Sequence, residues 1–272
     1  TPGGTVTVPT YTITHPAVTG GTVTVSPRSA NRGRLVTLTV TPDEGYELAS
    51  LTVTDGRGNI IALTDVGDGK YTFTMPASRV VVSAAFQLES LPFTDVAEGV
   101  WYYDAIAYVY HKGLMGGVSS TQFAPDSTLD RATLATILWR LAGEPVVNYL
   151  LPFEDVPEGE WYSEAIRWAA STGIVTGTTP TTFRPTQAVT REQMAAMVYR
   201  YAEHMGYDTT ASSDMTGFTD GASVNGYAVT PMSWSVAEGL ISGIGTEIRP
   251  QSTATRAQIA TMLMRFCENV AD

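Results

Sequence analysis

A motif of fixed spacing occurs three times in this 272-residue chain and constrains its fold more than any other feature. In each copy a proline lies six residues before an arginine, and a helix-spaced apolar run follows; the pairs are Pro125 and Arg131, Pro185 and Arg191, and Pro250 and Arg256. The arginines are 60 and 65 residues apart, and so are Asp95, Asp155 and Asp220 of three Phe-x-Asp sequences. Self-similarity at such a period predicts a repeat architecture.

Each repeat predicts two helices. The first opens near an aromatic residue and ends before a glycine, the residue expected just past a helix end, which gives the pairs Trp101 and Gly113, Trp161 and Gly173, and Tyr227 and Gly239. The second helix begins at the arginine. Thr190 with Gln193 and Thr255 with Gln258 have the spacing of a capping box, whereas Asp130 with Thr133 makes an incomplete one.

The second helix of each repeat carries an apolar stripe at positions i, i+3, i+4 and i+7. The stripes are Leu134, Ile137, Leu138 and Leu141; Met194, Met197, Val198 and Tyr201; and Ile259, Met262, Leu263 and Phe266. Two helices alone bury too little core, so we expect the three repeats to form one cooperative unit. We also expect Trp168 and Trp234 in the core, and Cys267 as a small buried residue on a helix.

The first 90 residues follow a different pattern. Thr and Val alternate in short runs separated by Gly, Pro, Asp and Asn, which predicts a small all-β module with one buried face; the runs are Gly21 to Ser26, Leu35 to Thr41, Leu51 to Thr54, Lys70 to Met75 and Val80 to Phe86. Hairpin turns are predicted at Asp55 to Asn59 and at Gly67 to Gly69. Residues 1–18 are a linker, an added strand or the remnant of a preceding copy.

Composition limits the partners. The formal net charge of −11 argues against nucleic acid and anionic membrane, which select basic surfaces. No apolar run approaches the roughly 18 residues of a membrane span, so no membrane insertion is expected. One cysteine and three scattered histidines predict no metal site and no cofactor. Because the chain lacks an initiator Met, we interpret it as a processed or excised piece.

In repeated order the chain shows F-x-D-V, W-Y-x-x-A-I, helix-end glycines, F-x-P and T-R-x-x. Through these motifs residues 93–267 resemble three tandem S-layer homology domains, a module that anchors proteins to bacterial envelopes. Residues 18–87 resemble a bacterial-repeat or divergent InlB B-repeat β module, through GGTVTVSP, TVTPDEGYEL and YTFTMP. We place the domain boundary at 1–90 and 91–272, with repeats at about 91–147, 151–206 and 216–270.

The resemblance implies an all-α, pseudo-threefold helical bundle after the β module. It also implies that grooves between repeats bind secondary cell wall polymer, a glycan that often ends in pyruvylated N-acetylmannosamine. We therefore expect a non-enzymatic, secreted protein of the cell envelope or S-layer that anchors to the wall. We expect a monomer in solution, with the three repeats as its pseudo-trimeric unit.

Arg131, Arg191 and Arg256 are the first candidate ligand-binding residues. An arginine at a helix N-terminus opposes the helix dipole, whereas free N–H groups there attract an anion that a guanidinium can clamp. The alternative is an exposed arginine, or one paired with a carboxylate of a neighbouring repeat. Asp130 beside Arg131 replaces the threonine of the other copies and could repel an anion, so the grooves that use Arg191 and Arg256 are favoured.

The other candidates come from the same motifs. The sugar-stacking aromatics would be Trp101, Trp161 and Tyr227, whose alternative role is packing of the first helix. Glycines that let the backbone approach a glycan would be Gly117, Gly177 and Gly243, although turn geometry alone could require them. Thr190 and Thr255 complete the set.

Two other functions stay open at this point. One is a structural component of an S-layer lattice. The other is a glycan-active enzyme whose acid and base lie among Asp95, Glu98, Asp155 and Glu158. Repetition of these carboxylates at equivalent positions favours a structural role, because a catalytic pair needs two different environments.

Overall fold

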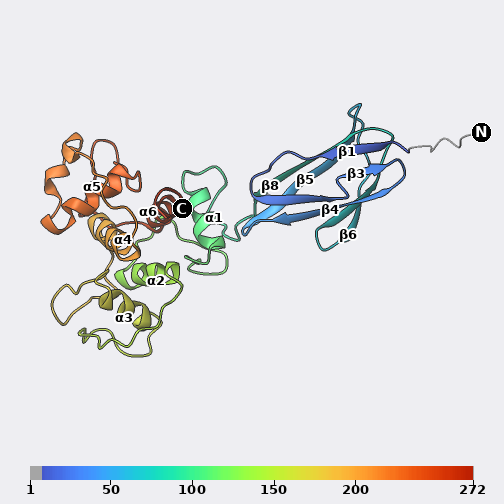
Figure 1. The fold of residues 1–272 in the computed structure, drawn as a ribbon. Coiled ribbons are helices and arrows are strands. Elements are labelled where there is room, and N and C mark those ends of the chain that lie inside the picture. Colours follow the sequence, from blue (N-terminus) through green and yellow to red (C-terminus); the bar gives the residue numbers. More distant parts are fainter. Residues whose placement is uncertain (1–7, 272) are drawn as a thin grey trace, which may run out of the picture. The chain divides into compact units, whose positions relative to one another are not determined.

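The structure is a computed structural model that describes residues 8–271. The chain divides between Ser90 and Leu91 into two compact units. Among the described residues the first unit contains strands and the second contains α-helices and short 3₁₀ turns (Figure 1). We call them the β unit and the helical unit.

Within residues 8–90 the β unit consists of two four-stranded sheets. One sheet has the order β3 (Ser29–Asn31), β1 (Thr10–Thr14), β8 (Val80–Leu88) and β5 (Tyr46–Asp55). The other has the order β2 (Gly21–Ser26), β4 (Leu35–Pro42), β7 (Lys70–Thr74) and β6 (Thr64–Gly67). Strand pairs are antiparallel except β1 with β8, which is parallel.

The predicted alternation is confirmed in β2, where Val23 and Val25 are buried and the threonines between them are exposed. Inward-facing residues of both sheets form one hydrophobic cluster, so the sheets pack face to face. The hairpin turn between β6 and β7 lies at Gly67 to Gly69, all with positive φ, as predicted. Of the three roles considered for the first 18 residues, Thr10–Thr14 takes that of an added strand; residues 1–7 lie outside the described residues.

Residues 91–271 form six α-helices, two in each repeat. They are α1 (Tyr103–His111), α2 (Arg131–Leu141), α3 (Ser163–Ser171), α4 (Arg191–Met205), α5 (Val229–Ala237) and α6 (Arg256–Asn269). Three 3₁₀ turns precede α5, namely η1 (Met215–Gly217), η2 (Gly221–Ser223) and η3 (Gly226–Ala228). The second helices begin at the arginines, as predicted, and each first helix begins two residues after its aromatic residue. The glycines predicted past the ends of α1, α3 and α5 are confirmed, since Gly113, Gly173 and Gly239 all have positive φ.

The caps of the second helices follow their predicted chemistry. Both halves of a capping box are present at Thr190 with Gln193 and at Thr255 with Gln258. At α2 the carboxylate of Asp130 accepts from the N–H of Thr133, and the reciprocal bond is absent from this described helix, as expected without a glutamine. These caps fix where α2, α4 and α6 begin.

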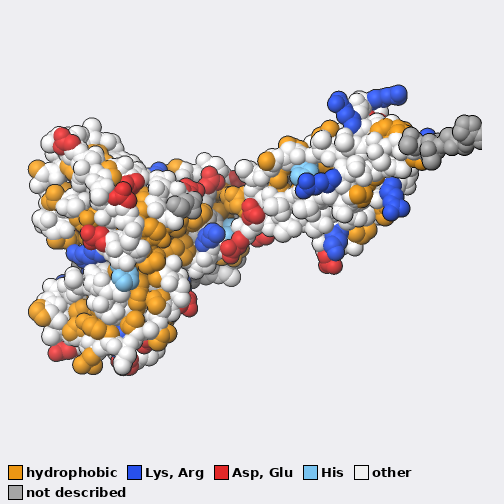
Figure 2. All heavy atoms as spheres, viewed as in Figure 1, with side chains coloured by type: hydrophobic (Ala, Val, Ile, Leu, Met, Phe, Trp, Pro, Cys, Tyr) orange, Lys and Arg blue, Asp and Glu red, His pale blue; other side chains and the backbone are white. Residues whose placement is uncertain are grey.

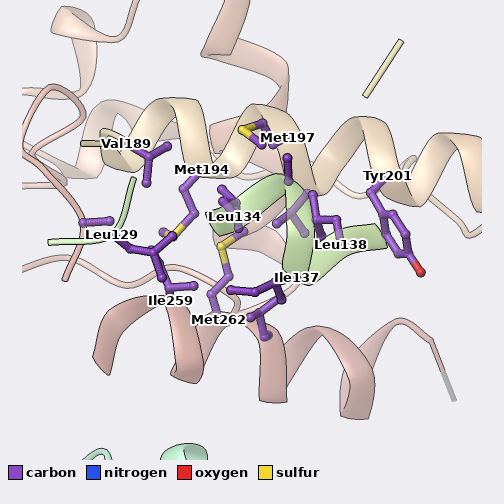
Figure 3. Close-up of a cluster of buried hydrophobic side chains, with 14 of the residues drawn as sticks. Leu129, Leu134, Ile137, Leu138, Val189, Met194, Met197, Tyr201, Ile259 and Met262 are labelled. Atoms are coloured by element: carbon purple, nitrogen blue, oxygen red, sulfur yellow. The ribbon is translucent and has the colours of Figure 1, made fainter. Parts of the chain in front are cut away.

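The apolar stripes of α2, α4 and α6 meet in a single core. Figure 3 shows Leu134, Ile137 and Leu138 of α2 lying between side chains of α4 and α6. Trp168, Trp234 and Cys267 are also buried in it, as predicted. The repeats therefore share one hydrophobic core and not three separate ones.

Helices pair across repeats. The second helix of one repeat packs against the first helix of the next, in the pairs α2 with α3 and α4 with α5, and α6 packs back against α1 (Figure 1). The three loops before the second helices also meet. The N–H of Val189 donates to Leu129, that of Ala254 to Val189, and that of Leu129 to Ala254, at 2.9, 2.9 and 3.4 Å between N and O. Each repeat thus contributes one donor and one acceptor to a closed ring of hydrogen bonds.

The charge is unevenly distributed. On the face shown in Figure 2, basic side chains are scattered over the β unit, and acidic side chains are spread over the helical unit. No helix within residues 8–271 is long and apolar enough to cross a membrane.

We predict that Thr190→Ala destabilises the helical unit by about 1 kcal/mol, because the N–H of Gln193 loses its acceptor at the start of α4. Thr190→Ser keeps the hydroxyl and should retain most of the stability. Urea unfolding followed by circular dichroism at 222 nm measures both. Equal stability of the alanine variant and the wild type would contradict the cap.

Candidate functional site

The three arginines of the repeated motif are held by the next repeat. Arg131 Nε donates to the carbonyl of Phe183 at 2.9 Å, and its Nη2 donates to that of Thr176 at 2.9 Å. Arg191 makes the same bonds to Ile248 and Ser242, and Arg256 makes them to Phe123 and Gly116. Arg131 and Arg191 are only 6% and 4% exposed. Neither of the alternatives drawn from the sequence describes this arrangement, in which backbone carbonyls hold a buried guanidinium.

Two of these arginines also lie over an aromatic ring. The Cζ atoms of Arg131 and Arg256 are 4.5 Å from the ring centroids of Phe183 and Phe123. Arg191 meets Ile248 at the equivalent position, so this junction lacks the cation–π interaction. The phenylalanine of the F-x-P motif therefore makes a cation–π contact with the first arginine of the preceding repeat.

The N–H groups at the start of these helices are occupied. The N–H groups of Arg131 and Ala132 donate to the carbonyls of Gln187 and Pro185, both at 3.0 Å. Helices α4 and α6 make the equivalent bonds to the following repeat, with α6 bonding to the first. The expectation that free N–H groups there bind an anion is therefore wrong, because the neighbouring repeat takes the first two and the cap takes the third.

Asp95, Asp155 and Asp220 each clamp the loop that the arginine contacts. The two carboxylate oxygens of Asp95 accept from the N–H groups of Phe123 and Ala124 at 2.9 and 2.7 Å, and the other two aspartates repeat this geometry. The second residue of each clamped pair has positive φ although it is not glycine. Burial raises the pKa of Asp95 and of Asp220, but the backbone N–H donors outweigh it and hold both below the ordinary value. The structural role favoured from the sequence is confirmed.

Gly117, Gly177 and Gly243 are required by packing. A Cβ on Gly177 would lie 2.1 Å from the carbonyl oxygen of Thr179 and 2.7 Å from the ring of Phe153. On Gly117 it would lie 2.4 Å from the Ser119 oxygen and 2.5 Å from the ring of Phe93. The F-x-D phenylalanine thus packs against the glycine of the same repeat.

Three grooves lie between the repeats, and each combines candidate residues from all three. Groove A contains Arg131, Gly177 and Tyr227; groove B contains Arg191, Gly243 and Trp101; groove C contains Arg256, Gly117 and Trp161. Their volumes are about 340, 270 and 170 Å³. In each groove the arginine comes from one repeat, the glycine loop from the next and the aromatic from the third.

The aromatics stand at the rims. Trp101, Trp161 and Tyr227 are 66, 59 and 49% exposed. The indole rings lie edge-on against Tyr102 and Tyr162. An exposed ring beside a cation is a suitable surface for a sugar, and core packing does not account for these three side chains.

Every groove contains a second arginine that was not among the candidates drawn from the sequence. Arg200, Arg265 and Arg140 line grooves A, B and C, each nine residues after the first arginine of its repeat. On α4 the groove face runs through Gln193, Met197 and Arg200, at positions i, i+4 and i+7. The signal was available in the spacing, because these arginines recur at the same intervals of 60 and 65 residues.

In groove A the positive charge of the second arginine acts on the first. Burial lowers the pKa of the Arg131 guanidinium, Tyr227 partly opposes this, and the positive charge of Arg200 lowers the pKa further. For Arg191 and Arg256 burial also lowers the pKa, but the second arginine of the same groove is not among the causes. An anion between Arg131 and Arg200 would relieve their repulsion.

Thr190 and Thr255 lie outside the linings of the three grooves and act as helix caps. Asp130 also acts as a cap, and among the described residues no ion pair joins it to Arg131. Within residues 8–271 no group of three or more His, Cys, Asp or Glu side chains is placed to hold a metal ion.

Comparison with known families decides what the repeats are. The S-layer homology domain model matches residues 92–135, 152–195 and 217–260, and the divergent InlB B-repeat domain model matches residues 11–90. The chain contains one divergent InlB B-repeat domain followed by three S-layer homology domains. The three matched segments each run from the F-x-D clamp into the second helix, which includes the first arginine.

Relatives of this S-layer homology chain are longer proteins of several kinds. It is 28% identical over 198 residues to an amylopullulanase of Thermoanaerobacterium thermosulfurigenes, covering 72% of the chain and 10% of the relative. It is 27% identical over 174 residues to S-layer protein sap of Bacillus anthracis, covering 64% of the chain and 21% of the relative. It is 28% identical over 163 residues to a cellulosome-anchoring protein of Acetivibrio thermocellus, covering 58% of the chain and 35% of the relative. The chain spans 10 to 35% of the length of these three relatives.

We predict that Gly117→Ala destabilises the helical unit by about 1–3 kcal/mol, because the methyl group overlaps backbone oxygens and the ring of Phe93. Gly116→Ala is the matched control, since a Cβ there meets nothing within 4 Å. Thermal unfolding compares the two variants. A control that unfolds as early as Gly117→Ala would contradict the packing account.

The aspartate clamps predict an acid dependence. The pKa of Asp95 and of Asp220 is lowered in the folded state, so their stabilisation is full above the unfolded pKa of about 4 and is lost as the pH falls through the lowered value. Asp95→Asn should cost about 1 kcal/mol at pH 7 and flatten the decline in stability as the pH falls below about 4. Urea unfolding across this range measures it, with Asp126→Asn on an exposed aspartate as the control. Parallel pH curves for Asp95→Asn and the wild type would exclude the clamp as a contributor.

Proposed function

We propose that the helical unit anchors a surface protein to the bacterial cell wall by binding an anionic glycan of the secondary wall polymer in grooves A, B and C. One observation carries the proposal: each groove places two arginines and an exposed aromatic ring around a glycine-containing loop. Guanidinium groups recognise a carboxylate or phosphate, and the ring offers a face to a sugar. The finer proposal is a carboxylate ligand, as in the pyruvate ketal of N-acetylmannosamine.

The two arginines of a groove have different roles. The first, such as Arg131, donates from Nε and Nη2 to carbonyls of the neighbouring repeat. It therefore contributes its positive charge to the groove but has few N–H groups left for a ligand. Among the described residues the side chains of the second arginines Arg200 and Arg140 make no hydrogen bond, and both can form a bidentate contact with an anion. Arg265 of groove B uses one Nη atom to donate to the carbonyl of Gly239 and keeps its other donors for an anion. Binding specificity would then depend mainly on the second arginine.

The proposal includes a pseudo-threefold arrangement of the repeats. The cyclic hydrogen bonds of the three arginines, the closed ring of Leu129, Val189 and Ala254, and the equivalent make-up of the grooves support it. Because one groove needs residues of three repeats, the binding module would be the whole helical unit in a single chain. A monomer can therefore hold complete sites.

The grooves differ in rank. The sequence favoured grooves B and C, because of Asp130 beside Arg131. The carboxylate of Asp130 is committed to the cap of α2, whereas the positive charge of Arg200 acts on Arg131 and lowers its pKa. With the largest volume and this pair of charges, groove A is our leading candidate.

We also propose a role without catalysis, in a secreted protein of the cell envelope that displays the β unit. Asp95 and Asp155 are bound to backbone N–H groups in equivalent loops, and Glu158 forms a surface ion pair with Arg167. Glycoside hydrolysis needs a pair of carboxyl groups facing one sugar, whereas these three carboxylates are occupied by two separate loops and a surface arginine. The relatives named for anchoring and for S-layers support attachment as the shared task.

Binding is tested by pull-down and calorimetry with purified secondary wall polymer, using Arg200→Ala, Arg265→Ala, Arg140→Ala and the triple variant. Loss of a charge-assisted contact costs about 1.5–3 kcal/mol, so we expect the triple variant to lose at least about tenfold in affinity. Polymer treated with mild acid to remove ketals should bind more weakly. Arg32→Ala, in the β unit, is the charge-matched control for each single variant.

Two results would refute the proposal. One is a wild-type chain that does not bind the polymer. The other is a triple variant that folds and binds as well as the wild type. Substituting Arg131, Arg191 or Arg256 would be less informative, because these residues also join the repeats.

A further inference from the structure

The junction between the second and third repeats contains a buried carboxylate that the other two junctions lack. Glu192, the second residue of α4, is 3% exposed. The equivalent residues of α2 and α6 are Ala132 and Ala257, which are also buried. A carboxylate is almost never buried without partners, so its replacement of alanine here requires an explanation.

All the hydrogen-bond donors to the carboxylate of Glu192 belong to the third repeat. Its Oε1 accepts from Asn225 Nδ2 at 2.5 Å and from the Tyr227 hydroxyl at 3.1 Å. Its Oε2 accepts from the Asn225 N–H at 3.1 Å and from Gln251 Nε2 at 3.2 Å. Four donors converge on an acceptor-only group, and a glutamine could not satisfy them equally because its amide nitrogen accepts no hydrogen bond.

The same junction is the one where tyrosine replaces tryptophan. Where the second helix has alanine, the facing rim residue is Trp161 or Trp101; where it has Glu192, the rim residue is Tyr227. Among the described residues neither indole N–H forms a hydrogen bond, and both rings are more exposed than that of Tyr227. The glutamate and the tyrosine hydroxyl are therefore complementary changes on the two sides of one interface.

We propose that Glu192 is a positioning residue that fixes Tyr227 across this interface and so gives groove A a rigid aromatic wall, unlike the two tryptophan grooves. Tyr227 lines groove A together with Arg131 and Arg200. With its hydroxyl tied to Glu192, the ring is held beside both guanidinium groups before any ligand arrives. Such preorganisation lowers the ordering cost of binding. The role in ligand choice rests on the function proposed above, whereas the positioning itself does not.

The electrostatics agree with this geometry. Burial first, and then the negative charge of Glu192 and its hydrogen bond, raise the pKa of Tyr227 to about 12. The phenol therefore stays protonated at neutral pH and remains a donor to the carboxylate. Arg131 and Arg200 act in the opposite direction.

The positioning is tested without a ligand by a double-mutant cycle of Glu192→Ala and Tyr227→Phe in urea unfolding. We expect the two changes to be non-additive, because either one removes the same contact. Glu192→Ala should also speed amide hydrogen exchange across residues 221–228 at least about threefold, the scale of one lost hydrogen bond. Glu268→Ala on the exposed side of α6 is the control for loss of an acidic residue.

Rescue distinguishes positioning from general stability. Glu192→Ala with Tyr227→Trp recreates the residue pair of the other two junctions and leaves no hydroxyl unpaired. We expect this double variant to regain the part of the stability that the unpaired Tyr227 hydroxyl costs, while the donors of Asn225 and Gln251 still lack the carboxylate. Additive effects in the cycle, or exchange rates unchanged from those of the control, would overturn the proposal even if the polymer binds.

The effect on groove A is tested with purified wall polymer in two backgrounds. With Arg140→Ala and Arg265→Ala only groove A is intact, and there Tyr227→Phe should weaken binding about threefold to tenfold. With Arg200→Ala the other grooves remain, and Tyr227→Phe should change nothing. Equal effects in both backgrounds would show that the contact does not act through groove A. Failure of the wild type to bind the polymer would refute the proposed function. The double-mutant cycle would then still test whether Glu192 positions Tyr227.

Discussion

The buried arginine between neighbouring repeats is the interaction on which the helical unit depends. A guanidinium removed from water must have partners for its N–H groups, and here two backbone carbonyls of the next repeat supply them. The loop that offers these carbonyls is itself shaped by an aspartate clamp and a left-handed residue. Each repeat therefore completes the hydrogen bonds of its neighbour.

This dependence explains how one set of residues can build a core and a site together. The first arginine holds the loop of the next repeat by its backbone carbonyls. The glycine of that loop then lies near the helix that follows the loop, and a groove is left between the arginine, the loop and this helix. The first arginine forms part of the wall and joins two repeats. The second joins no repeats, although Arg265 donates to the carbonyl of Gly239 within its own repeat. In our proposal, stability and recognition are thus assigned to arginines nine residues apart on the same helix.

Local features were predictable from the sequence because they depend on neighbouring residues. The capping boxes at Thr190 and Thr255, the terminal glycine at Gly113 and the stripe ending at Tyr201 all follow from spacings within one or two turns. The hydrogen-bond acceptors of the arginines were not predictable from the sequence. The bond from Arg131 to the carbonyl of Phe183 joins residues that are 52 positions apart. The aspartate clamps and the network of Glu192 depend on separations of 28 to 59 residues, and a pattern search within a repeat does not reach them.

Arg191 has a role in the structure that differs from the one its position in the sequence suggests. Its position against the helix dipole suggested a ligand, but two carbonyls from the third repeat account for its charge at the helix start. The second arginines carry no such anomaly in their local sequence. They were overlooked because a charged residue near the end of an amphipathic helix is ordinary, and only its repetition at fixed intervals makes it informative.

The closed ring of hydrogen bonds among Leu129, Val189 and Ala254 has no first member. Because α6 packs on α1 as α2 packs on α3, the order of the repeats is a property of the covalent chain and not of the contacts. The exposed connection around Val146 and Leu150 could then be the place where the chain is opened, with residues 271 and 91 joined by a linker instead. Such a circular permutant would keep every groove, since each is built from three repeats regardless of which one is translated first.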